Sequence, residues 1–213
     1  MTTLYLIRHG ETETNNSGIV AGMYDAKLTD AGIKQGLLVA ERFKDVHLDA
    51  IYSSDISRAV IMAKEIAKFH DLPVQFETRL REINLGDWEG RHVNELKEKW
   101  PKEYQVWMED QGHCTCPNGE SIQDVEDRVM SGIRAIVEKH PNQTVLCVTH
   151  GLALKTIFVS LRHASLLQFR NLKYVSNASI TTIKAENGAI KLENYGDDSY
   201  LDADMITHIF SEA

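Results

Sequence analysis

The chain has few cysteines and no long apolar run, and both absences restrict the class of protein. Its 213 residues include three cysteines, too few for the disulfide framework of a small secreted domain. No apolar run approaches the roughly 20 residues that cross a bilayer, and residues 1–3 lead into a strand pattern without a signal peptide. These features favour a cytoplasmic protein without membrane contact.

The chain also has fewer basic than acidic residues. Lysine and arginine total 23 against 31 aspartates and glutamates, which gives a formal net charge of −8. A general nucleic-acid binder usually carries a basic surplus, so nucleic acid is not an expected partner. A local cluster of arginines still attracts phosphate on an acidic protein, so small anionic substrates agree with this charge. The oligomeric state stays open.

Strand and helix patterns alternate along most of the chain. Strand patterns occupy 3–8, 50–52, 73–76 and 144–149, helix patterns occupy 29–44, 55–69, 121–138 and 152–162, and a closing hairpin spans 178–195. Alternating β and α units predict a three-layer α/β/α fold with a mainly parallel central sheet. We expect a single domain over 1–213, with a loosely held tail at 196–213.

The stretch 84–120 breaks this alternation. It contains three tryptophans and two prolines and shows little periodicity, so we expect a helical insertion that covers the substrate crevice. Its aromatic side chains either line a pocket for the leaving group or pack the insertion onto the sheet. His113, Cys114 and Cys116 match no standard zinc-ligand spacing, so no metal site is expected.

Two histidines stand where predicted strands stop. One lies in the string Arg8-His9-Gly10-Glu11 and the other in Thr149-His150-Gly151. In an open α/β sheet the ligand crevice lies beyond the carboxyl ends of the strands, so both histidines should face one crevice. Imidazole titrates near neutral pH and acts as nucleophile, acid or base, so the pair suggests chemistry.

The neighbours of these histidines suit a phosphoryl group. Arg8 lies next to His9, and Arg58 lies just past the end of the second strand pattern. Two guanidinium groups can grip phosphate oxygens with paired, charge-assisted hydrogen bonds. Asn15 and the backbone N–H groups after Gly151 offer further donors. Glu82 follows the third strand and is the candidate acid for the leaving oxygen. The nearby carboxylates that compete with it for this role are Glu11, Asp87 and Glu89.

Together these strings resemble the histidine phosphatase superfamily, in its phosphoglycerate-mutase-like branch, over nearly the whole chain. The matching residues are Arg8-His9-Gly10-Glu11, Asn15, Gly22, Asp25, Leu28-Thr29, Ser54, Arg58, the string 82–90, the string 117–121, Arg128 and Thr149-His150-Gly151. A bare Arg-His-Gly string is a weak signal, but five separate strings in the family's order and spacing are specific.

The resemblance implies a role for each matching position. His9 would be the phosphorylated nucleophile, and Glu82 or a neighbouring carboxylate the proton donor. Arg8, Arg58 and His150 would form the phosphate pocket. The positions expected to line the substrate site are Asn15, Ala21, Gly22 and Gly151. Neither a metal nor a cofactor is implied.

Three departures separate the chain from the mutases of this branch. Those enzymes usually carry arginine at the position of Ile19 and threonine or glutamine at Ala21, and family members often carry arginine where Lys155 stands. They also follow the catalytic glutamate with Arg-His-Tyr-Gly, whereas this chain has Ile-Asn-Leu-Gly at 83–86. That form resembles the phosphatase members, such as α-ribazole-phosphate and broad-specificity phosphatases.

The sequence therefore predicts a metal-independent phosphomonoesterase that works through a phosphohistidine on His9. The alternatives are a cofactor-dependent phosphoglycerate mutase and a non-catalytic protein that binds a phosphorylated ligand. A small phosphomonoester is the expected partner. Whether it is a sugar phosphate, a phosphoglycerate, a nucleotide-like phosphate or α-ribazole phosphate stays open.

Overall fold

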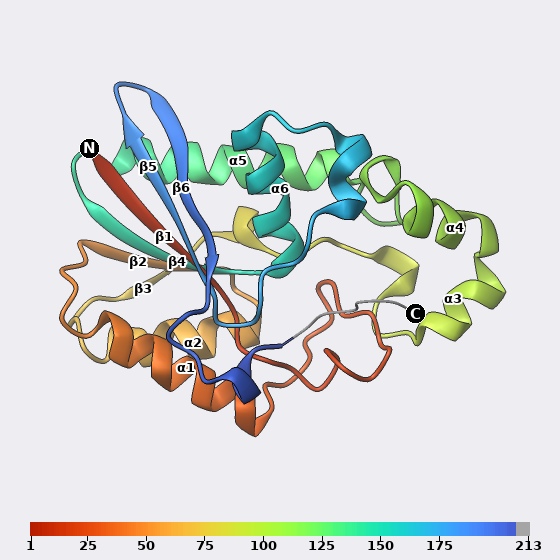
Figure 1. Ribbon diagram of the computed structural model, residues 1–213, viewed down its shortest axis with the longest axis horizontal. Coiled ribbons are helices and arrows are strands. Elements are labelled where there is room, and N and C mark those ends of the chain that lie inside the picture. The colour runs from red at the N-terminus through yellow and green to blue at the C-terminus, as the bar shows by residue number, and fades with distance from the viewer. Residues whose placement is uncertain (208–213) are drawn as a thin grey trace.

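A six-stranded sheet forms the centre of the protein, and the computed structural model describes it within residues 1–207 (Figure 1). The strand order is β3-β2-β4-β1-β5-β6. The strands are β1 (Thr2–Arg8), β2 (Ala50–Ser53), β3 (Val74–Phe76), β4 (Thr144–Thr149), β5 (Ile180–Glu186) and β6 (Ala189–Asp197). β1 to β4 are parallel, while β5 runs antiparallel to both β1 and β6. This is the mainly parallel sheet that the sequence predicts.

Helices cover both faces of the sheet. One layer consists of α1 (Asp30–Phe43) and α2 (Ser57–Ala67), and the other of α5 (Ile122–Lys139) and α6 (Gly151–Arg162) (Figure 1). Successive side chains of a strand point to opposite faces. In β4, Leu146 accordingly packs in the α1–α2 core, and Cys147 packs in the α5–α6 core. The three-layer α/β/α prediction is confirmed.

Polar side chains fix where two of these helices begin. Thr29 precedes α1 and its side chain accepts a hydrogen bond from the backbone N–H of Gly32. Ser121 precedes α5 and forms a reciprocal capping box with Asp124. Both caps satisfy backbone N–H groups that have no partner inside the helix. The helix starts therefore agree with the sequence pattern.

The insertion 84–120 contains α3 (Val93–Lys99) and α4 (Pro101–Glu109), which lie beyond the carboxyl ends of the strands (Figure 1). Trp88 is 1% exposed, and its ring lies 5.7 Å from the Trp107 ring and 6.4 Å from the Tyr104 ring, between centroids. These three aromatic side chains pack the insertion onto the α5–α6 core.

The chain after β6 returns to the sheet. Ser176 Oγ donates a hydrogen bond to Asp198, the Tyr200 hydroxyl donates one to the carbonyl of Ala178, and Leu201 is buried. The described chain thus stays attached to the fold after residue 197. The remainder of the expected loose tail, 208–213, lies outside the described residues.

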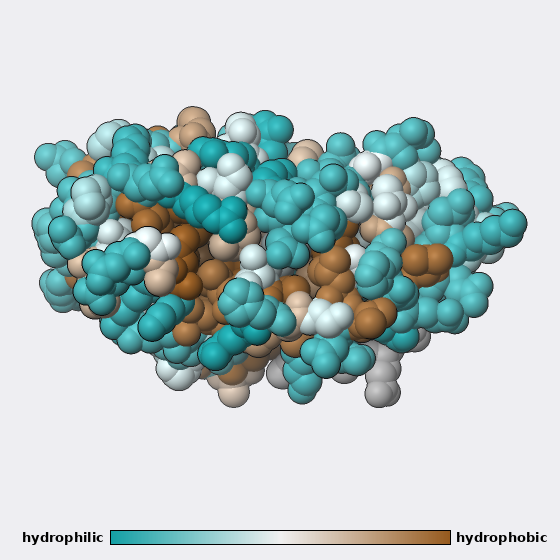
Figure 2. Space-filling model, turned by 90° about the horizontal axis from the view of Figure 1, so that it is seen from above, coloured by the Kyte–Doolittle hydropathy of each residue, from teal (hydrophilic) through white to brown (hydrophobic). Residues whose placement is uncertain are grey.

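The surface is mainly hydrophilic. Seen from above, polar side chains cover most of the molecule and apolar ones are visible in hollows between them (Figure 2). Within the described chain, none of the helices combines the length and apolar character needed to span a membrane.

Candidate active site

The loop after β1 holds His9 tightly against its surroundings. The His9 backbone N–H donates to Thr149 O at 3.0 Å, and its carbonyl accepts from Asn177 Nδ2 at 3.0 Å. A Cβ on Gly10 would collide with the carbonyl oxygen of Gly32 at the start of α1. Glycine at position 10 therefore allows the loop to pack directly on that helix.

Two hydrogen bonds define the tautomer of His9. Nδ1 lies 2.8 Å from the carbonyl oxygen of Gly10, which only accepts, so Nδ1 carries the proton. Nε2 therefore has its lone pair free and accepts a hydrogen bond from Arg58 Nε at 3.2 Å. Burial, together with the charges of Arg58 and Arg8, holds the pKa of His9 well below its usual 6.5. The imidazole is neutral at pH 7, which is the nucleophilic form.

Arg58 reaches His9 from the first turn of α2. Its Nη1 donates to Tyr24 O at 2.8 Å and its Nη2 to Gly22 O at 2.6 Å. Glu89 holds this loop from the other side, accepting from the backbone N–H groups of Met23 and Tyr24. Gly22 has φ +50°, and a Cβ there would collide with Glu89, so glycine suits this turn.

His150 lies beside His9 at the end of β4. The two rings pack edge to face with their centroids 5.0 Å apart. His150 Nε2 is 2.8 Å from Ser54 Oγ, while its Nδ1 is buried and has no hydrogen-bond partner within residues 1–207. Burial, then the nearby charges led by Arg58, keep the pKa of His150 well below 6.5. At neutral pH this imidazole is therefore uncharged.

Arg8 is buried at the end of β1, next to His9 in the chain. Its Nη1 donates to Val175 O at 2.5 Å, but its buried Nε lacks a partner in the part of the chain that is described. Burial lowers the pKa of Arg8 to about 10, so the guanidinium is charged at neutral pH. A Cβ on Gly151 would lie 3.1 Å from Arg8 Nε. Glycine at the start of α6 thus leaves space for the guanidinium.

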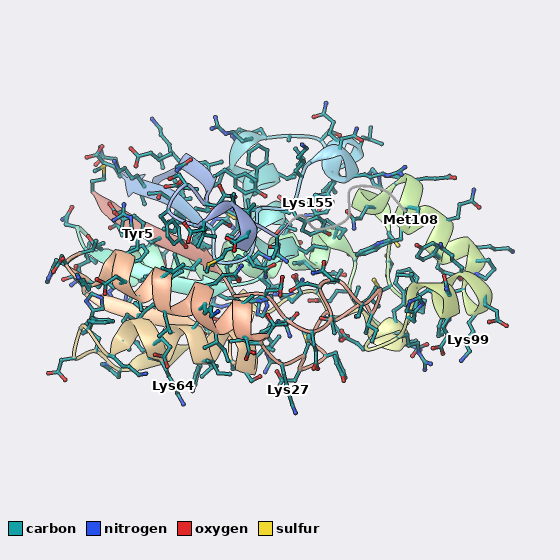
Figure 3. All side chains as sticks on the ribbon, turned by 60° about the horizontal axis from the view of Figure 1, so that its bottom comes forward. Tyr5, Lys27, Lys64, Lys99, Met108 and Lys155 are labelled. Carbon is teal, nitrogen blue, oxygen red and sulfur yellow. The ribbon has the colours of Figure 1, made fainter. Side chains whose placement is uncertain are left out.

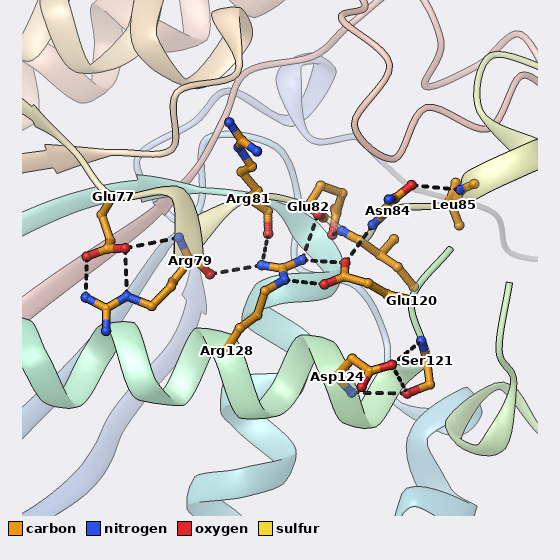
Figure 4. Close-up of polar contacts among 12 residues, drawn as sticks. Glu77, Arg79, Arg81, Glu82, Asn84, Leu85, Glu120, Ser121, Asp124 and Arg128 are labelled. Carbon is orange, nitrogen blue, oxygen red and sulfur yellow. Dashed lines mark hydrogen bonds and ion pairs between the residues drawn. The ribbon is translucent and has the colours of Figure 1, made fainter. Parts of the chain in front are cut away.

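The carboxyl group of Glu82 lies at the start of α6. Its Oε2 accepts from the backbone N–H of Leu152 at 3.0 Å, and its Oε1 accepts from Ile83 N at 3.0 Å. Arg128 fixes the backbone of this segment, donating to Glu82 O at 2.8 Å and Arg81 O at 2.8 Å (Figure 4). Glu120 completes the clamp by accepting from Arg128 Nε at 2.6 Å.

The competing carboxylates have other partners. Glu11 accepts from Thr29 Oγ1 at 2.8 Å, and Asp87 accepts from Asn118 Nδ2 at 3.0 Å. Glu89 binds backbone N–H groups, and burial raises its pKa. Of the four candidate acids, Glu82 is the one whose carboxyl group accepts a hydrogen bond from the first turn of α6, next to His150.

The structure therefore brings Arg8, His9, Arg58, Glu82, His150 and Gly151 to one place. Gly22 contacts the site through its carbonyl oxygen on Arg58. Asn15 Oδ1 instead accepts from the backbone N–H of Thr12 at 2.7 Å, so it stabilises the loop. Ala21 is partly buried in the same loop, and its carbonyl accepts from Tyr24 N.

Sequence reasoning missed a supporting contact from Asn177, which holds the His9 carbonyl from 168 positions away. No pattern marks this residue, because it lies in an irregular connection. Ser54, in contrast, follows β2 directly and binds His150. The rule that placed the histidines at strand ends also applies to Ser54.

The model of the histidine phosphatase superfamily (branch 1) matches residues 4–198 of this chain. The chain belongs to this superfamily. Phosphoserine phosphatase 1 of Hydrogenobacter thermophilus is 36% identical over 186 residues, which cover 87% of this chain and 88% of that protein. A probable phosphoglycerate mutase, GpmB, of Escherichia coli is 31% identical over 218 residues, which cover 98% of this chain and 99% of that protein.

A solved structure has the same architecture. Bacillus stearothermophilus YhfR superposes with a TM-score of 0.89 at 34% identity, covering 94% of this chain and 99% of that one. The fold is thus that of the phosphoglycerate-mutase-like histidine phosphatases, and the protein is a phosphoric monoester hydrolase of this superfamily.

Proposed function

We propose that this histidine phosphatase hydrolyses a small phosphomonoester without a metal, through a phosphohistidine on His9. One observation carries the proposal. Arg8 Nε and His150 Nδ1 are both buried in the pocket that holds His9, and neither has a partner in the described residues. Leaving a buried polar group unpaired is costly. A phosphoryl group would supply the missing acceptors.

Phosphate binding rearranges the hydrogen bonds of the pocket. Arg58 Nε transfers its bond from His9 Nε2 to a phosphoryl oxygen, which exposes the lone pair to phosphorus. The negative charge of the phosphate favours a proton on His150, since an opposite charge stabilises the charged form. His150, whose pKa lies well below 6.5 in this structure, thus becomes a cation when substrate binds.

The first step transfers the phosphoryl group. His9 Nε2 attacks phosphorus, the N–P bond forms, and the P–O bond to the leaving group breaks. The carboxyl group of Glu82 gives a proton to the leaving oxygen, and the alcohol departs. The imidazole of the phosphohistidine carries a positive charge, and the Gly10 carbonyl stabilises it through Nδ1–H.

The second step releases phosphate. Glu82, now a carboxylate, accepts a proton from water while the water oxygen attacks phosphorus. The N–P bond breaks and its electron pair returns to His9 Nε2. Arg8, Arg58 and His150 hold the equatorial oxygens in both steps, because the same charge develops in both transition states.

The substrate is a small metabolite, and phosphoserine is the first candidate because of the Hydrogenobacter relative. The similarity to the probable phosphoglycerate mutase of E. coli supports the alternative, a mutase. A mutase moves phosphate between hydroxyls of a phosphoglycerate, requires a bisphosphate primer and releases little free phosphate.

The test is phosphate release from a panel of phosphomonoesters in excess chelator, with wild type and His9→Ala side by side. We expect chelator-resistant turnover by the wild type and a loss of at least about 10⁴-fold in the variant. Substantial turnover by His9→Ala would refute the phosphohistidine route. Primer-dependent conversion of 3-phosphoglycerate without phosphate release would establish the mutase.

A further inference from the structure

The side chain of Lys155 is buried. It lies on α6 one turn after Gly151 and is 1% exposed. Figure 3 contrasts it with Lys27, Lys64 and Lys99, whose side chains extend from the surface. Within residues 1–207 Lys155 forms no ion pair. A buried amine needs other partners, and these partners define a cluster next to the active site.

Two aromatic rings and one amide surround the amine. Lys155 Nζ lies 4.4 Å from the centroid of the Phe169 ring and 4.5 Å from that of the Tyr174 ring, so it makes two cation–π contacts. It donates its hydrogen bond to Gln111 Oε1 at 3.1 Å. Gln111 belongs to the short 3-10 helix Gln111–His113 of the insertion.

The contact with Lys155 determines which way the Gln111 amide faces. The amide oxygen only accepts and the amide nitrogen only donates. Burial lowers the pKa of Lys155 to about 7, while the two ring faces favour its charged form. In that form, an amide turned round would place its NH₂ group against the NH₃⁺ group, two donors in contact. Gln111 therefore directs Nε2 to the hydroxyl oxygen of Tyr174, at 3.4 Å.

The direction of this bond decides what the Tyr174 hydroxyl can do. Its oxygen already accepts from Gln111, so its proton is available to an acceptor elsewhere. Burial, and then the nearby Glu82, raise the pKa of Tyr174, so the phenol keeps its proton at neutral pH. The ring borders the active site, since a Cβ on Gly151 would lie 3.3 Å from Tyr174 Cδ1.

We propose that Tyr174 donates a hydrogen bond to the leaving group of the substrate, and that Lys155 and Gln111 are positioning residues that set the direction of this bond. The inference rests on the proposed hydrolysis. Arg8, Arg58 and His150 already serve the phosphate, whereas Tyr174 stands beside Gly151, next to the helix start that binds Glu82. The preferred substrate therefore has a carboxylate or hydroxyl oxygen close to its ester oxygen.

Matched pairs of esters test this specificity. O-phosphoserine and O-phosphoethanolamine differ only by a carboxylate, and glycerol 3-phosphate and propyl phosphate differ only by two hydroxyls. Phenyl phosphate, whose leaving group has no further oxygen, reports the chemistry alone. We expect the wild type to prefer the oxygen-bearing member of at least one pair. Equal turnover within both pairs would overturn the inference, while no phosphate release from any ester would overturn the proposed function instead.

Tyr174→Phe removes the donor and keeps the ring. A hydrogen bond to a charged group corresponds to about 10- to 100-fold in kcat/KM. We expect a loss of this size, mainly in KM, for the preferred oxygen-bearing ester, and less than about threefold for its partner and for phenyl phosphate. An equal loss on all esters, or no loss on any, would contradict the role of Tyr174.

Lys155→Met tests the positioning role, with Lys155→Arg as the matched variant that still donates to Gln111. We expect Lys155→Met to lose the same substrate preference and Lys155→Arg to keep most of it. In the double variant Lys155→Met with Tyr174→Phe, the losses should not multiply, because both act on one hydrogen bond. Multiplying losses, or equal behaviour of the Met and Arg variants, would refute the link from Lys155 to Tyr174.

Discussion

Arg58 donates a hydrogen bond from its Nε to Nε2 of His9, the nitrogen that faces the phosphate pocket. The lone pair that we propose attacks phosphorus is therefore hydrogen-bonded to the residue that we propose binds the phosphate. The arrangement keeps a buried, neutral imidazole fully hydrogen-bonded without substrate. In the proposed mechanism, phosphate binding exchanges this bond for one to a phosphoryl oxygen, so the nucleophile would become free only when its target is present.

The fork of Arg58 predicts that lysine cannot replace it. The guanidinium bonds His9, Tyr24 O and Gly22 O with three separate nitrogens, whereas an ammonium is a single point of charge. We expect Arg58→Lys to lower kcat/KM for phosphate release by about 10²-fold or more. The control is Arg134→Lys on the exposed side of α5, which should stay within twofold of wild type. A fully active Arg58→Lys enzyme would contradict the three-point role.

Ser54 predicts a separate effect on His150. Its hydroxyl contacts His150 Nε2, which leaves Nδ1 as the ring nitrogen available to the phosphate in the proposed mechanism. Ser54→Ala should lower kcat by about 10- to 100-fold, because the imidazole loses its orientation. Ser53→Ala is the matched control, since the Ser53 hydroxyl binds the Ser54 carbonyl and does not contact the ring. Steady-state kinetics of the two variants measures the difference, and equal losses would argue for a packing effect.

The position of Arg128 predicts that the effect of its loss on kcat depends on the leaving group of the ester. It clamps the backbone that carries Glu82, so Arg128→Gln should misplace the proton donor. An alkyl phosphate requires a proton on its leaving oxygen, whereas p-nitrophenyl phosphate leaves without one. We expect kcat to fall about 10-fold or more for the alkyl ester and much less for the nitrophenyl ester. Equal losses on both esters would mean that Glu82 is not the acid.

The lowered pKa values of His9 and His150 predict that the free energy of unfolding depends on pH. Their folded pKa values lie below the unfolded value of 6.5, so the unfolded chain binds more protons below that pH. The free energy of unfolding should therefore be fully present above about pH 6.5 and fall as the pH drops, by about 1.4 kcal/mol per pH unit for each histidine. Urea unfolding at pH 7.5 and 5.5 measures this loss.

The double variant His9→Asn, His150→Asn is the control for this pH dependence of stability. It removes both buried imidazoles, so the difference in unfolding free energy between the two pH values should shrink. Vanadate, a phosphate-like anion, should bind the wild type and raise its stability at both pH values. An unchanged pH dependence in the double variant would show that other groups cause the acid lability.

Local patterns determined the architecture and the main members of the site. The alternation of strand and helix patterns favours a mainly parallel sheet covered by helices, because each element must bury its apolar face. Parallel strands then bring their carboxyl ends to one edge. That rule alone places Arg8 and His9 beside His150, although 141 positions separate the two histidines.

The tertiary structure decided which atoms meet. The tautomer of His9 depends on the Gly10 carbonyl and on Arg58, and the clamp on the segment of Glu82 depends on Arg128 from α5. The cluster of Lys155, Gln111 and Tyr174 joins α6 to two irregular segments that carry no periodic signal. Sequence periodicity reports which face of an element is buried, but hydrogen bonds between irregular segments depend on distances of a few ångströms, which only the packed fold defines.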